Sequence, residues 1–401
     1  MKIGIYGGTF NPIHTGHMQA VKFAAEYLQL DKLLLIPAGI PPHKALREDA
    51  ADGVHRMAMT KLAAEAMELS CSVEVSDMEL QRQGKSYTVD TLRALREQHP
   101  DAKLYFFMGT DMFLSFHTWY QPEEIAKLCT ICAFGRSEAD TEELFAVQRQ
   151  YLAEKLGADC VTISLPRIVD ISSTQLREAL AQGRGREYLA PAVYGYILRE
   201  GLYGTDADLK QLSVDDLRCV AMTLLKHRRI PHVLGTEEMA AKLALRWGAD
   251  EGAARRAALL HDCTKKLNME QHGAILRQYK IELDDEERNT EKLLHAPTGA
   301  AVARYIFGVS DEVEQAIRWH TTGRADMTLL EKIIYLADYI EPTRDFCDLR
   351  ELRCLAFEDL DRALLLGFTM AVTDLRKKGM PLHPNSVYAR DYLKGKLHEQ
   401  G

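Results

Sequence analysis

The chain has 401 residues, more than the ~250–300 at which a single hydrophobic core usually stops growing, so we expect two domains. Apolar residues make up 46% and charged residues 27%, so each domain can bury a core. The net charge of -8 excludes a general attraction to nucleic acid, and we expect small anionic ligands and no nucleic-acid partner.

The sequence contains no membrane-spanning or secretory signal. No apolar stretch approaches the ~20 residues that cross a bilayer, and the first strand leads on without a cleavable signal peptide. We therefore expect a cytoplasmic protein with no membrane partner. The eight cysteines should then be thiols. Cys129 and Cys132 form a CxxC, but with no second pair at metal spacing we predict that both are core residues of a short buried strand.

The first half alternates strand-like and helical runs. We predict strands over Lys2–Tyr6, Lys32–Ile36, Ser72–Val75, Lys103–Met108, Thr130–Phe134 and Val161–Leu165. Helices are predicted between them, over Met18–Gln29, Val54–Met67, Val89–His99, Ile125–Leu128 and Glu142–Leu156. This order is typical of a parallel, doubly wound α/β sheet, in which ligands bind beyond the C-terminal ends of the strands.

A glycine- and histidine-rich loop follows the first predicted strand. It reads Gly7-Gly8-Thr9-Phe10-Asn11-Pro12-Ile13-His14-Thr15-Gly16-His17. The two glycines let backbone amides approach phosphate oxygens, and the two histidines, three residues apart at a helix start, project from nearly one face. The loop therefore predicts a binding site for a nucleoside triphosphate.

Three further segments carry polar groups at loop or helix starts. Lys44 lies on the loop after the second strand, and Gly109 and Asp111 lie just beyond the fourth. The run from Ile171 to Arg177 combines an N-cap cluster with an arginine one turn into a helix, so amides, hydroxyls and a guanidinium converge there.

The opening loop resembles the HxGH loop of nucleotidylyltransferases, and in this form that of bacterial nicotinate-nucleotide adenylyltransferases. The resemblance covers roughly Met1–Tyr203 and implies a Rossmann-like sheet. It implies roles for His14, His17, Lys44 and Arg177 as donors to reacting phosphates. It also implies nucleotide or substrate contacts for Gly7, Gly8, Thr9, Phe10, Gly109, Asp111, Arg136, Ile171, Ser172, Ser173 and Thr174.

Two segments resemble the family's pyridine site. Ser86–Leu92, with Tyr87 and Thr88, resembles the segment that receives the nicotinate carboxylate, and Trp119 resembles the tryptophan that stacks on the pyridine ring. After Phe134 the chain reads Gly135-Arg136-Ser137, where the family commonly has Arg-Pro-Gly.

The chemistry implied by this resemblance is adenylyl transfer. The phosphate of nicotinate mononucleotide attacks the α-phosphorus of ATP, which carries Mg²⁺, and pyrophosphate leaves. Alignment and charge neutralisation suffice, because the substrate phosphate is already a nucleophile. A different adenylyl or cytidylyl transferase of the same fold is the alternative, and Ser86–Leu92 with Trp119 favours the pyridine nucleotide.

After Gly204 the pattern is helical out to Gly401, and we predict an all-α second domain, with domains of residues 1–204 and 205–401. Six residues within it could hold two metal ions, because imidazole nitrogen and carboxylate oxygen suit Fe, Mn or Zn and a carboxylate can bridge a pair. They are His232, His261, Asp262, His295, His320 and Asp338.

The order of these residues resembles the HD phosphohydrolase superfamily over roughly Leu212–Leu397. His261-Asp262-Cys263-Thr264-Lys265 gives HDxxK, and His320–Gly323 precedes the run from Ala337 to Arg344. These flanks are similar to the YqeK branch, whose members hydrolyse diadenosine tetraphosphate symmetrically to two ADP. This implies two divalent metals, Fe or Mn.

The resemblance also assigns roles to individual residues of the second half. It implies one metal held by His232, His261, Asp262 and Asp338, with Asp262 bridging to a second held by His295 and His320. Lys265, Arg229 and Arg344 are candidate phosphate partners.

Alternatives stay open for the second half. It could be a nucleotide-sensing regulatory module with negligible turnover, against which the complete set of six ligands argues. It could also hydrolyse another nucleotide. The expected ligands of the whole chain are ATP, nicotinate mononucleotide and dinucleoside polyphosphates, and the sequence leaves a homo-oligomer open.

Overall fold

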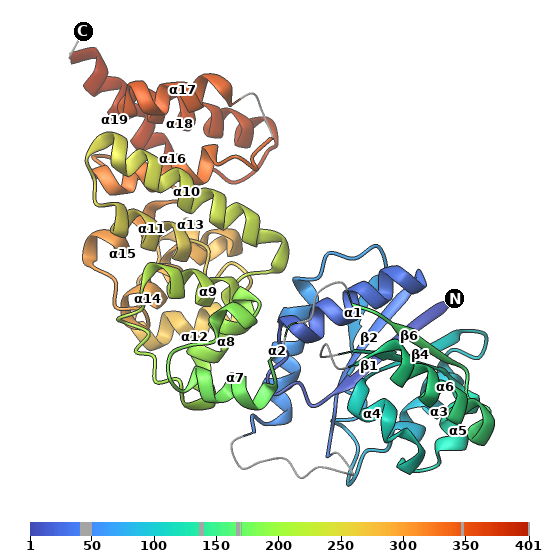
Figure 1. Cartoon of the computed structure of the whole chain (residues 1–401). Helices are drawn as coiled ribbons and strands as arrows, with labels where there is room; N and C mark the ends of the chain where they lie inside the picture. The colour runs from blue at the N-terminus through green and yellow to red at the C-terminus, as the bar shows by residue number, and fades with distance from the viewer. Residues whose placement is uncertain (41–49, 136–139, 166–168, 170, 346–348, 400–401) are drawn as a thin grey trace. The chain divides into compact units, whose positions relative to one another are not determined.

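The protein is described by a computed structural model that covers residues 1–40, 50–135, 140–165, 169, 171–345 and 349–399 (Figure 1). It divides into two compact units, Met1–Asp206 and Ala207–Gly401. No helix in these ranges combines the length and the apolar character that crossing a bilayer requires.

A six-stranded parallel sheet in the order β3-β2-β1-β4-β5-β6 forms the centre of the first unit. Figure 1 labels β1, β2, β4 and β6. Its strands are β1 (Lys2–Gly8), β2 (Lys32–Pro37), β3 (Ser72–Val75), β4 (Lys103–Gly109), β5 (Thr130–Phe134) and β6 (Cys160–Ile163). The predicted doubly wound parallel sheet is therefore confirmed, with strand ends shifted by a few residues at most.

Helices cover both faces of this sheet. They are α1 (Thr15–Leu28), α2 (Gly53–Glu65), α3 (Thr88–Gln98), α4 (Thr110–Leu114), α5 (Pro122–Leu128), α6 (Glu142–Leu156), α7 (Ser173–Leu180) and α8 (Pro191–Glu200). Short 3-10 turns are η1 (Phe116–Thr118), η2 (Arg186–Tyr188) and η3 (Leu202–Gly204). Residues of α1, α2, α7 and α8 pack on one face, and residues of α3 to α6 pack on the other.

Strand β5 illustrates why the central strands are apolar throughout. Cys132 and Phe134 belong to the core on one face, and Ile131 and Ala133 to the core on the other. A strand buried on both faces needs a continuous apolar run rather than an alternating one. Cys129 and Cys132 are both buried, as predicted, but only Cys132 lies in the strand, because Cys129 is the C-cap residue of α5. Burial raises the pKa of the Cys129 thiol to about 12.

Helix α1 begins at Thr15, three residues before the predicted start near Met18. The reason is local, because His14 is the N-cap residue and its backbone N–H donates to Nδ1 of His17 at 3.3 Å. Histidine is not among the preferred N-cap residues, so the sequence did not mark this position as a helix start.

The strand order places a topological switch point between β1 and β4, where ligands bind in doubly wound sheets. The register pairs Tyr6 with Phe107, so the ends of both strands, Gly8 and Gly109, lie at the same edge of the sheet. The loop with the two histidines leaves from this edge.

The second unit contains only helices in its described part, as predicted (Figure 1). They are η4 (His227–Arg229), η5 (Glu291–Leu293), α9 (Val214–Leu224), α10 (Ile230–Trp247), α11 (Glu251–Leu260), α12 (Met269–Tyr279), α13 (Asp285–Asn289), α14 (His295–Tyr305), α15 (Asp311–Trp319), α16 (Leu329–Ile340), α17 (Arg350–Glu358), α18 (Leu360–Lys377) and α19 (Pro384–Glu399).

Small side chains let the central helices of this unit approach closely. Helix α11 contacts α10, α15 and α16. Its Ala254, Ala257 and Ala258 are fully buried. Because interhelical distance depends on the side chains at the contact, these alanines bring polar residues of neighbouring helices into one cluster.

Candidate functional site

The two histidines of the opening loop stand side by side in the first unit. Their ring centroids are 3.7 Å apart, and the His14 side chain is buried while His17 is half-buried. Because Nδ1 of His17 accepts the His14 backbone N–H, the proton of a neutral His17 ring resides on Nε2. The two rings lie at the N-terminus of α1, where the helix dipole and the backbone amide donors favour a bound anion.

A network that the sequence analysis missed fixes this loop. Arg56 is 2% exposed, and its Nη1 donates to the carbonyls of Thr9 at 2.9 Å and Ala38 at 2.7 Å. The Tyr203 hydroxyl donates to Oδ1 of Asn11 at 2.7 Å. Arg56 thus ties together the chain segments that follow β1 and β2.

The start of α7 meets the same loop. Ser172 caps the helix, with its Oγ accepting from the Gln175 N–H at 3.2 Å. The Ser173 hydroxyl donates to the Pro12 carbonyl at 3.4 Å, and buried Arg177 donates to the Asn11 carbonyl at 2.9 Å. Ile171 and Thr174 are half-buried beside them. The structure therefore brings the predicted Ile171–Arg177 segment against the histidine loop.

Other predicted residues have more mixed positions. Gly109 ends β4 at the switch point and Asp111 is exposed in the first turn of α4. The Phe10 side chain is buried against His17, with ring centroids 5.5 Å apart, so any contact between Phe10 and a nucleotide would come from its backbone. Lys44 and Arg136 lie outside the described residues.

Aromatic rings gather near the segment predicted to receive nicotinate. Tyr87 is the N-cap residue of α3, with Thr88 next to it, and the Tyr87 ring centroid lies 4.6 Å from that of exposed Tyr120. Trp119 is half-buried and contacts the buried Phe116 ring at 5.3 Å. Tyr120 was not singled out from the sequence, although it adjoins Trp119.

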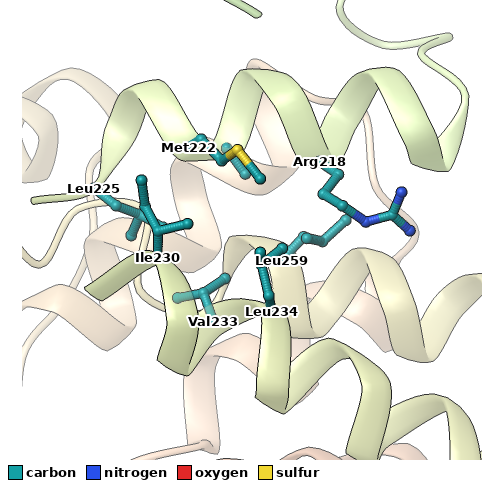
Figure 2. Close-up of a pocket in the computed structure, with 8 residues that line it drawn as sticks. Arg218, Met222, Leu225, Ile230, Val233, Leu234 and Leu259 are labelled. Carbon is teal, nitrogen blue, oxygen red and sulfur yellow. The ribbon is translucent and has the colours of Figure 1, made fainter. Parts of the chain in front are cut away.

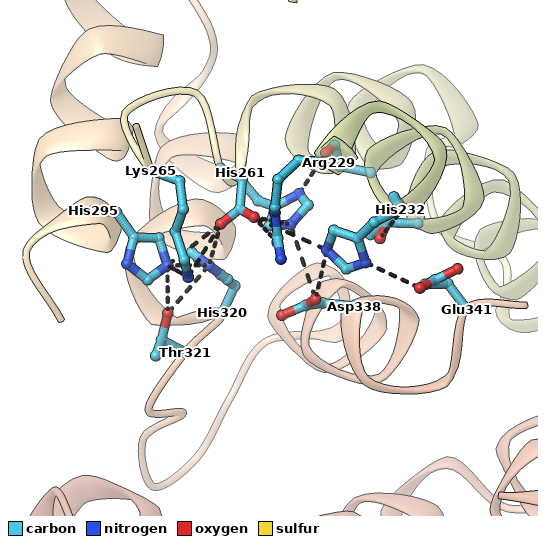
Figure 3. Close-up of polar contacts among 12 residues, drawn as sticks. Arg229, His232, His261, Lys265, His295, His320, Thr321, Asp338 and Glu341 are labelled. Carbon is cyan, nitrogen blue, oxygen red and sulfur yellow. Dashed lines mark hydrogen bonds and ion pairs between the residues drawn. The ribbon is translucent and has the colours of Figure 1, made fainter. Parts of the chain in front are cut away.

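The six predicted ligands of the second unit converge from five helices, and Figure 3 labels the four histidines and Asp338 among them. His232 is the third residue of α10, His261 and Asp262 follow α11, His295 opens α14, His320 follows α15, and Asp338 lies on α16. All but Asp338 are at least nine-tenths buried.

Asp262 lies between two groups of ligands. Its Oδ2 is 3.6 Å from Nε2 of His261 and 3.9 Å from Nε2 of His232. Its Oδ1 is 3.4 Å from Nε2 of His295 and 3.8 Å from Nε2 of His320. One oxygen therefore faces each group, as a carboxylate that bridges two metal ions would.

Each histidine is held by its other ring nitrogen. Nδ1 of His261, His295 and His320 donates to the carbonyl three residues earlier, at 2.6, 2.7 and 2.7 Å. Nδ1 of His232 donates to Oε1 of Glu341 at 3.0 Å. These bonds fix the tautomer, so all four Nε2 atoms present a lone pair to the centre.

The geometry fits a bound cation on two counts. Nε2 of His295 and Nε2 of His320 lie 3.1 Å apart and both face Oδ1 of Asp262, so three possible ligand atoms for one metal ion converge there. Buried Nε2 of His261 and Oδ1 of Asp262 have no hydrogen-bond partner. The residues present therefore suit divalent metal, with imidazole and carboxylate donors typical of Fe, Mn or Zn sites.

Burial keeps the imidazoles of His261, His295 and His320 neutral and ready to bind metal. It lowers the pKa of His320 to about 4 and the pKa values of His261 and His295 well below the ordinary range. Burial raises the pKa of Asp338, but the adjoining imidazoles and the guanidinium of Arg344 outweigh it and hold that pKa well below its usual value. A metal would thus meet neutral histidines and an ionised aspartate at neutral pH.

Three cations surround the cluster. Arg229 pairs with Oδ2 of Asp262, and Nη2 of Arg344 lies 2.6 Å from Oδ1 of Asp338. Lys265 lies on the other side, with Nζ 2.7 Å from Nε2 of His295, and burial lowers its pKa to about 8. The structure thus brings all three predicted phosphate partners to the site, together with Glu341 and Thr321, which the sequence analysis had not assigned.

Two other features of the second unit offer no comparable site. Asp284, Glu287 and His383 lie close together, but His383 is bonded to Asp284 at 2.8 Å and Glu287 to Arg318 at 2.6 Å. A crevice between α9, α10 and α11 (Figure 2) contains none of the six ligands. It is lined by Arg218, Ala221, Met222, Leu225, Ile230, Val233, Leu234 and Leu259.

Comparison with known proteins divides the chain in the same way. Residues 5–179 match the cytidylyltransferase-like family, and residues 229–343 match the HD domain. A probable nicotinate-nucleotide adenylyltransferase of Desulfatibacillum aliphaticivorans is 39% identical over 222 residues, covering 51% of this chain and all of that protein. The chain belongs to the nicotinate-nucleotide adenylyltransferase family.

Membership in this family rests on the first half, and a second relative agrees. The probable nicotinate-nucleotide adenylyltransferase of Clostridium tetani is 35% identical over 203 residues, covering 50% of this chain and 98% of that protein. The second half adds an HD domain, which implies divalent metal binding. The chain is therefore an enzyme, and the finer YqeK-type identity stays a prediction.

Solved structures resemble each half. A predicted HD superfamily hydrolase involved in NAD metabolism from Clostridium acetobutylicum is 42% identical, covering 46% of this chain and 98% of that one, with a TM-score of 0.44. Nicotinic acid mononucleotide adenylyltransferase of Plasmodium falciparum complexed with NaAD is 20% identical, with a TM-score of 0.43, and the match covers 51% of this chain and 98% of that one.

Proposed function

We propose that the chain is a bifunctional enzyme. The first half transfers the adenylyl group of ATP to nicotinate mononucleotide, and the second hydrolyses diadenosine tetraphosphate symmetrically to two ADP. The first activity is supported by the family and by the paired histidines at the start of α1. The second is supported by the HD domain and by the four Nε2 lone pairs around Asp262.

In the adenylyl transfer, the phosphate oxygen of the mononucleotide forms a bond to the α-phosphorus of ATP as the bond to pyrophosphate breaks. Nε2–H of His17 donates to the oxygens on which negative charge grows, and His14 supports it. Arg177 and the capped start of α7 receive the β and γ phosphates, and Lys44 is the further donor. Mg²⁺ bound to ATP would neutralise further phosphate charge.

The experiment for this half is direct. Full-length protein is incubated with ATP, Mg²⁺ and nicotinate mononucleotide, and the products are separated by anion exchange. We expect nicotinate adenine dinucleotide and pyrophosphate in equal amounts. Parallel reactions with nicotinamide mononucleotide measure pyridine selectivity. A protein that adenylylates neither mononucleotide, or that uses CTP instead, would contradict the proposal.

In the second half, two metals would be held by the ligands that Asp262 separates. His232, His261, Asp262 and Asp338 would hold one, and Asp262, His295 and His320 the other. Metals at these positions would acidify a water and neutralise phosphoryl oxygens. Arg229 and Arg344 on one side and Lys265 on the other would neutralise phosphates along the chain.

Cations on both sides of the metal ligands favour a long polyphosphate that extends in both directions from the cleaved bond. Symmetric cleavage adds water to one of the two central phosphorus atoms, and the oxygen that bridges them leaves with the second ADP. A nucleotide sensor without turnover and a hydrolase of another nucleotide are the alternatives.

Product analysis distinguishes the three. Protein loaded with iron or manganese is given diadenosine tetraphosphate, and the nucleotides are resolved by ion-exchange chromatography, with Asp262→Ala as control. Two ADP from the wild type and unchanged substrate with the variant are expected. ATP with AMP would contradict symmetric cleavage, and unchanged substrate from the wild type would favour the sensor or another nucleotide, which a substrate screen then separates.

A further inference from the structure

One of the four metal-site histidines is supported differently from the others. His261 and His320 directly follow the last residues of their helices, and each Nδ1–H donates to the carbonyl three residues earlier. His295 follows a 3-10 turn and does the same. His232 lies in the first turn of α10, and its Nδ1 donates to the Glu341 carboxylate instead.

We infer that Glu341 is a positioning residue that makes the two metal positions unequal. It orients His232 and adds negative charge behind it, which strengthens metal binding at the position formed by His232, His261, Asp262 and Asp338. The inference rests on the proposed dinuclear site of the second half.

The surroundings of Glu341 fix it in this role. Its side chain is fully buried, and Oε1 accepts from Nδ1 of His232 at 3.0 Å and from the Thr343 hydroxyl at 2.6 Å. Oε2 accepts from the Thr343 backbone N–H at 2.6 Å. Both oxygens therefore act only as acceptors, which is the pattern of an ionised carboxylate.

Gly235 makes the space that Glu341 needs. It lies on α10 three residues after His232, on the same helix face. A Cβ at Gly235 would lie 2.5 Å from Oε2 of Glu341, so a larger residue would displace the carboxylate from His232. The glycine and the carboxylate thus act as one fitted pair.

Cations contact ligands of both metal positions, because two guanidinium groups pair with the carboxylates of the first position and an ammonium group lies at the second, but only the first has a carboxylate behind one of its histidines. His295 and His320 are held by backbone carbonyls, and Nζ of Lys265 lies 2.7 Å from Nε2 of His295 and 3.5 Å from Oδ1 of Asp262. A metal entering there must displace or repel this ammonium group. Because the His232 position has four ligands rather than three and the carboxylate of Glu341 behind one of them, the two positions should fill at different metal concentrations, with the His232 position first.

The test is titration of metal-free, full-length protein with Co²⁺, followed by visible absorption and by metal content after gel filtration. We expect two steps in the wild type. Glu341→Gln should weaken the tighter step by about 10–100-fold, the usual effect of losing such a partner, and leave the weaker step unchanged. Glutamine has one acceptor oxygen, so it cannot serve both His232 and the Thr343 amide.

Two further variants keep this test decisive. Glu331→Gln removes a second fully buried carboxylate, which lies on α16 and pairs with Arg324 at 2.9 Å, and should leave both steps unchanged. Gly235→Ala perturbs Glu341 from α10 and should weaken the tighter step even if Glu341→Gln does not fold.

The inference would be overturned if Glu341→Gln and Gly235→Ala bound Co²⁺ in the same two steps as the wild type. It would also be overturned if Glu331→Gln weakened the tighter Co²⁺-binding step as much as Glu341→Gln does. No Co²⁺ binding by the wild type would instead overturn the proposed dinuclear site on which it rests.

Discussion

The two candidate sites are built by opposite means. In the first half, loops and helix starts meet at one edge of a parallel sheet, and backbone groups such as the carbonyls of Thr9 and Asn11 anchor the side chains. In the second half, buried side chains from five helices face one another around Asp262. The first arrangement suits a substrate that brings its own nucleophile and metal, and the second suits metals held by the protein.

The largest expected effect is on the second site. Asp262→Ala removes the carboxylate that directs one oxygen to each ligand group, so we expect loss of both metals and of detectable hydrolysis. Metal content per chain after dialysis measures this. Asp361→Ala is the control, because it removes a carboxylate paired with Lys332 and Lys396 rather than with the cluster. Retention of two metals by Asp262→Ala would contradict the view that side chains around Asp262 hold the metals of the second site.

In the first site we expect a smaller but still large loss from one side chain. His17→Ala should lower kcat of adenylyl transfer by about 10²–10³-fold, the usual effect of losing one donor to developing charge. Binding of nicotinate mononucleotide, measured by calorimetry, should change little. Hydrolysis by the second half is the internal control. Near-normal turnover would remove His17 from the proposed machinery.

Arg56→Met tests whether the anchors of the first site matter as much as its donors. The carbonyls of Thr9 and Ala38 would each lose a hydrogen bond, which costs about 1–3 kcal/mol for each buried group left without a partner. We expect lower stability in urea denaturation and about a tenfold loss in kcat/KM. Exposed Arg184→Met is the control. An Arg56 variant that matches it would show that the loop holds its shape unaided.

The smallest expected effect concerns two buried thiols, one in each half. Burial raises the pKa values of Cys129 and Cys263 to about 12, so neither should react with iodoacetamide at pH 8 in the metal-loaded protein. Chelation should increase labelling of Cys263 several-fold, because it adjoins Asp262, and leave Cys129 unlabelled. Peptide mass spectrometry measures both. Equal labelling would mean that the metals do not stabilise the second half selectively.

The sequence predicted the chemical groups better than the contacts that hold them. The sheet and the helical second half follow from apolar patterns among neighbouring residues, and the six candidate metal ligands follow from their residue types and from the resemblance to the HD superfamily. The roles of Glu341 and Arg56 were not predicted, because their hydrogen-bond partners lie 109 and 47 residues away in the chain and only the folded structure brings them together. The start of α1 at Thr15 was not predicted, because it depends on His14 and His17 capping the helix.

The central claim is that one chain carries two working sites, each with its own residues. The most direct measurement assays adenylyl transfer and diadenosine tetraphosphate hydrolysis in the same preparations of wild type, His17→Ala and Asp262→Ala. We predict complementary losses, in which each variant loses one activity and keeps the other within twofold of wild type. Loss of both activities in either variant, or retention of hydrolysis by Asp262→Ala, would contradict this account.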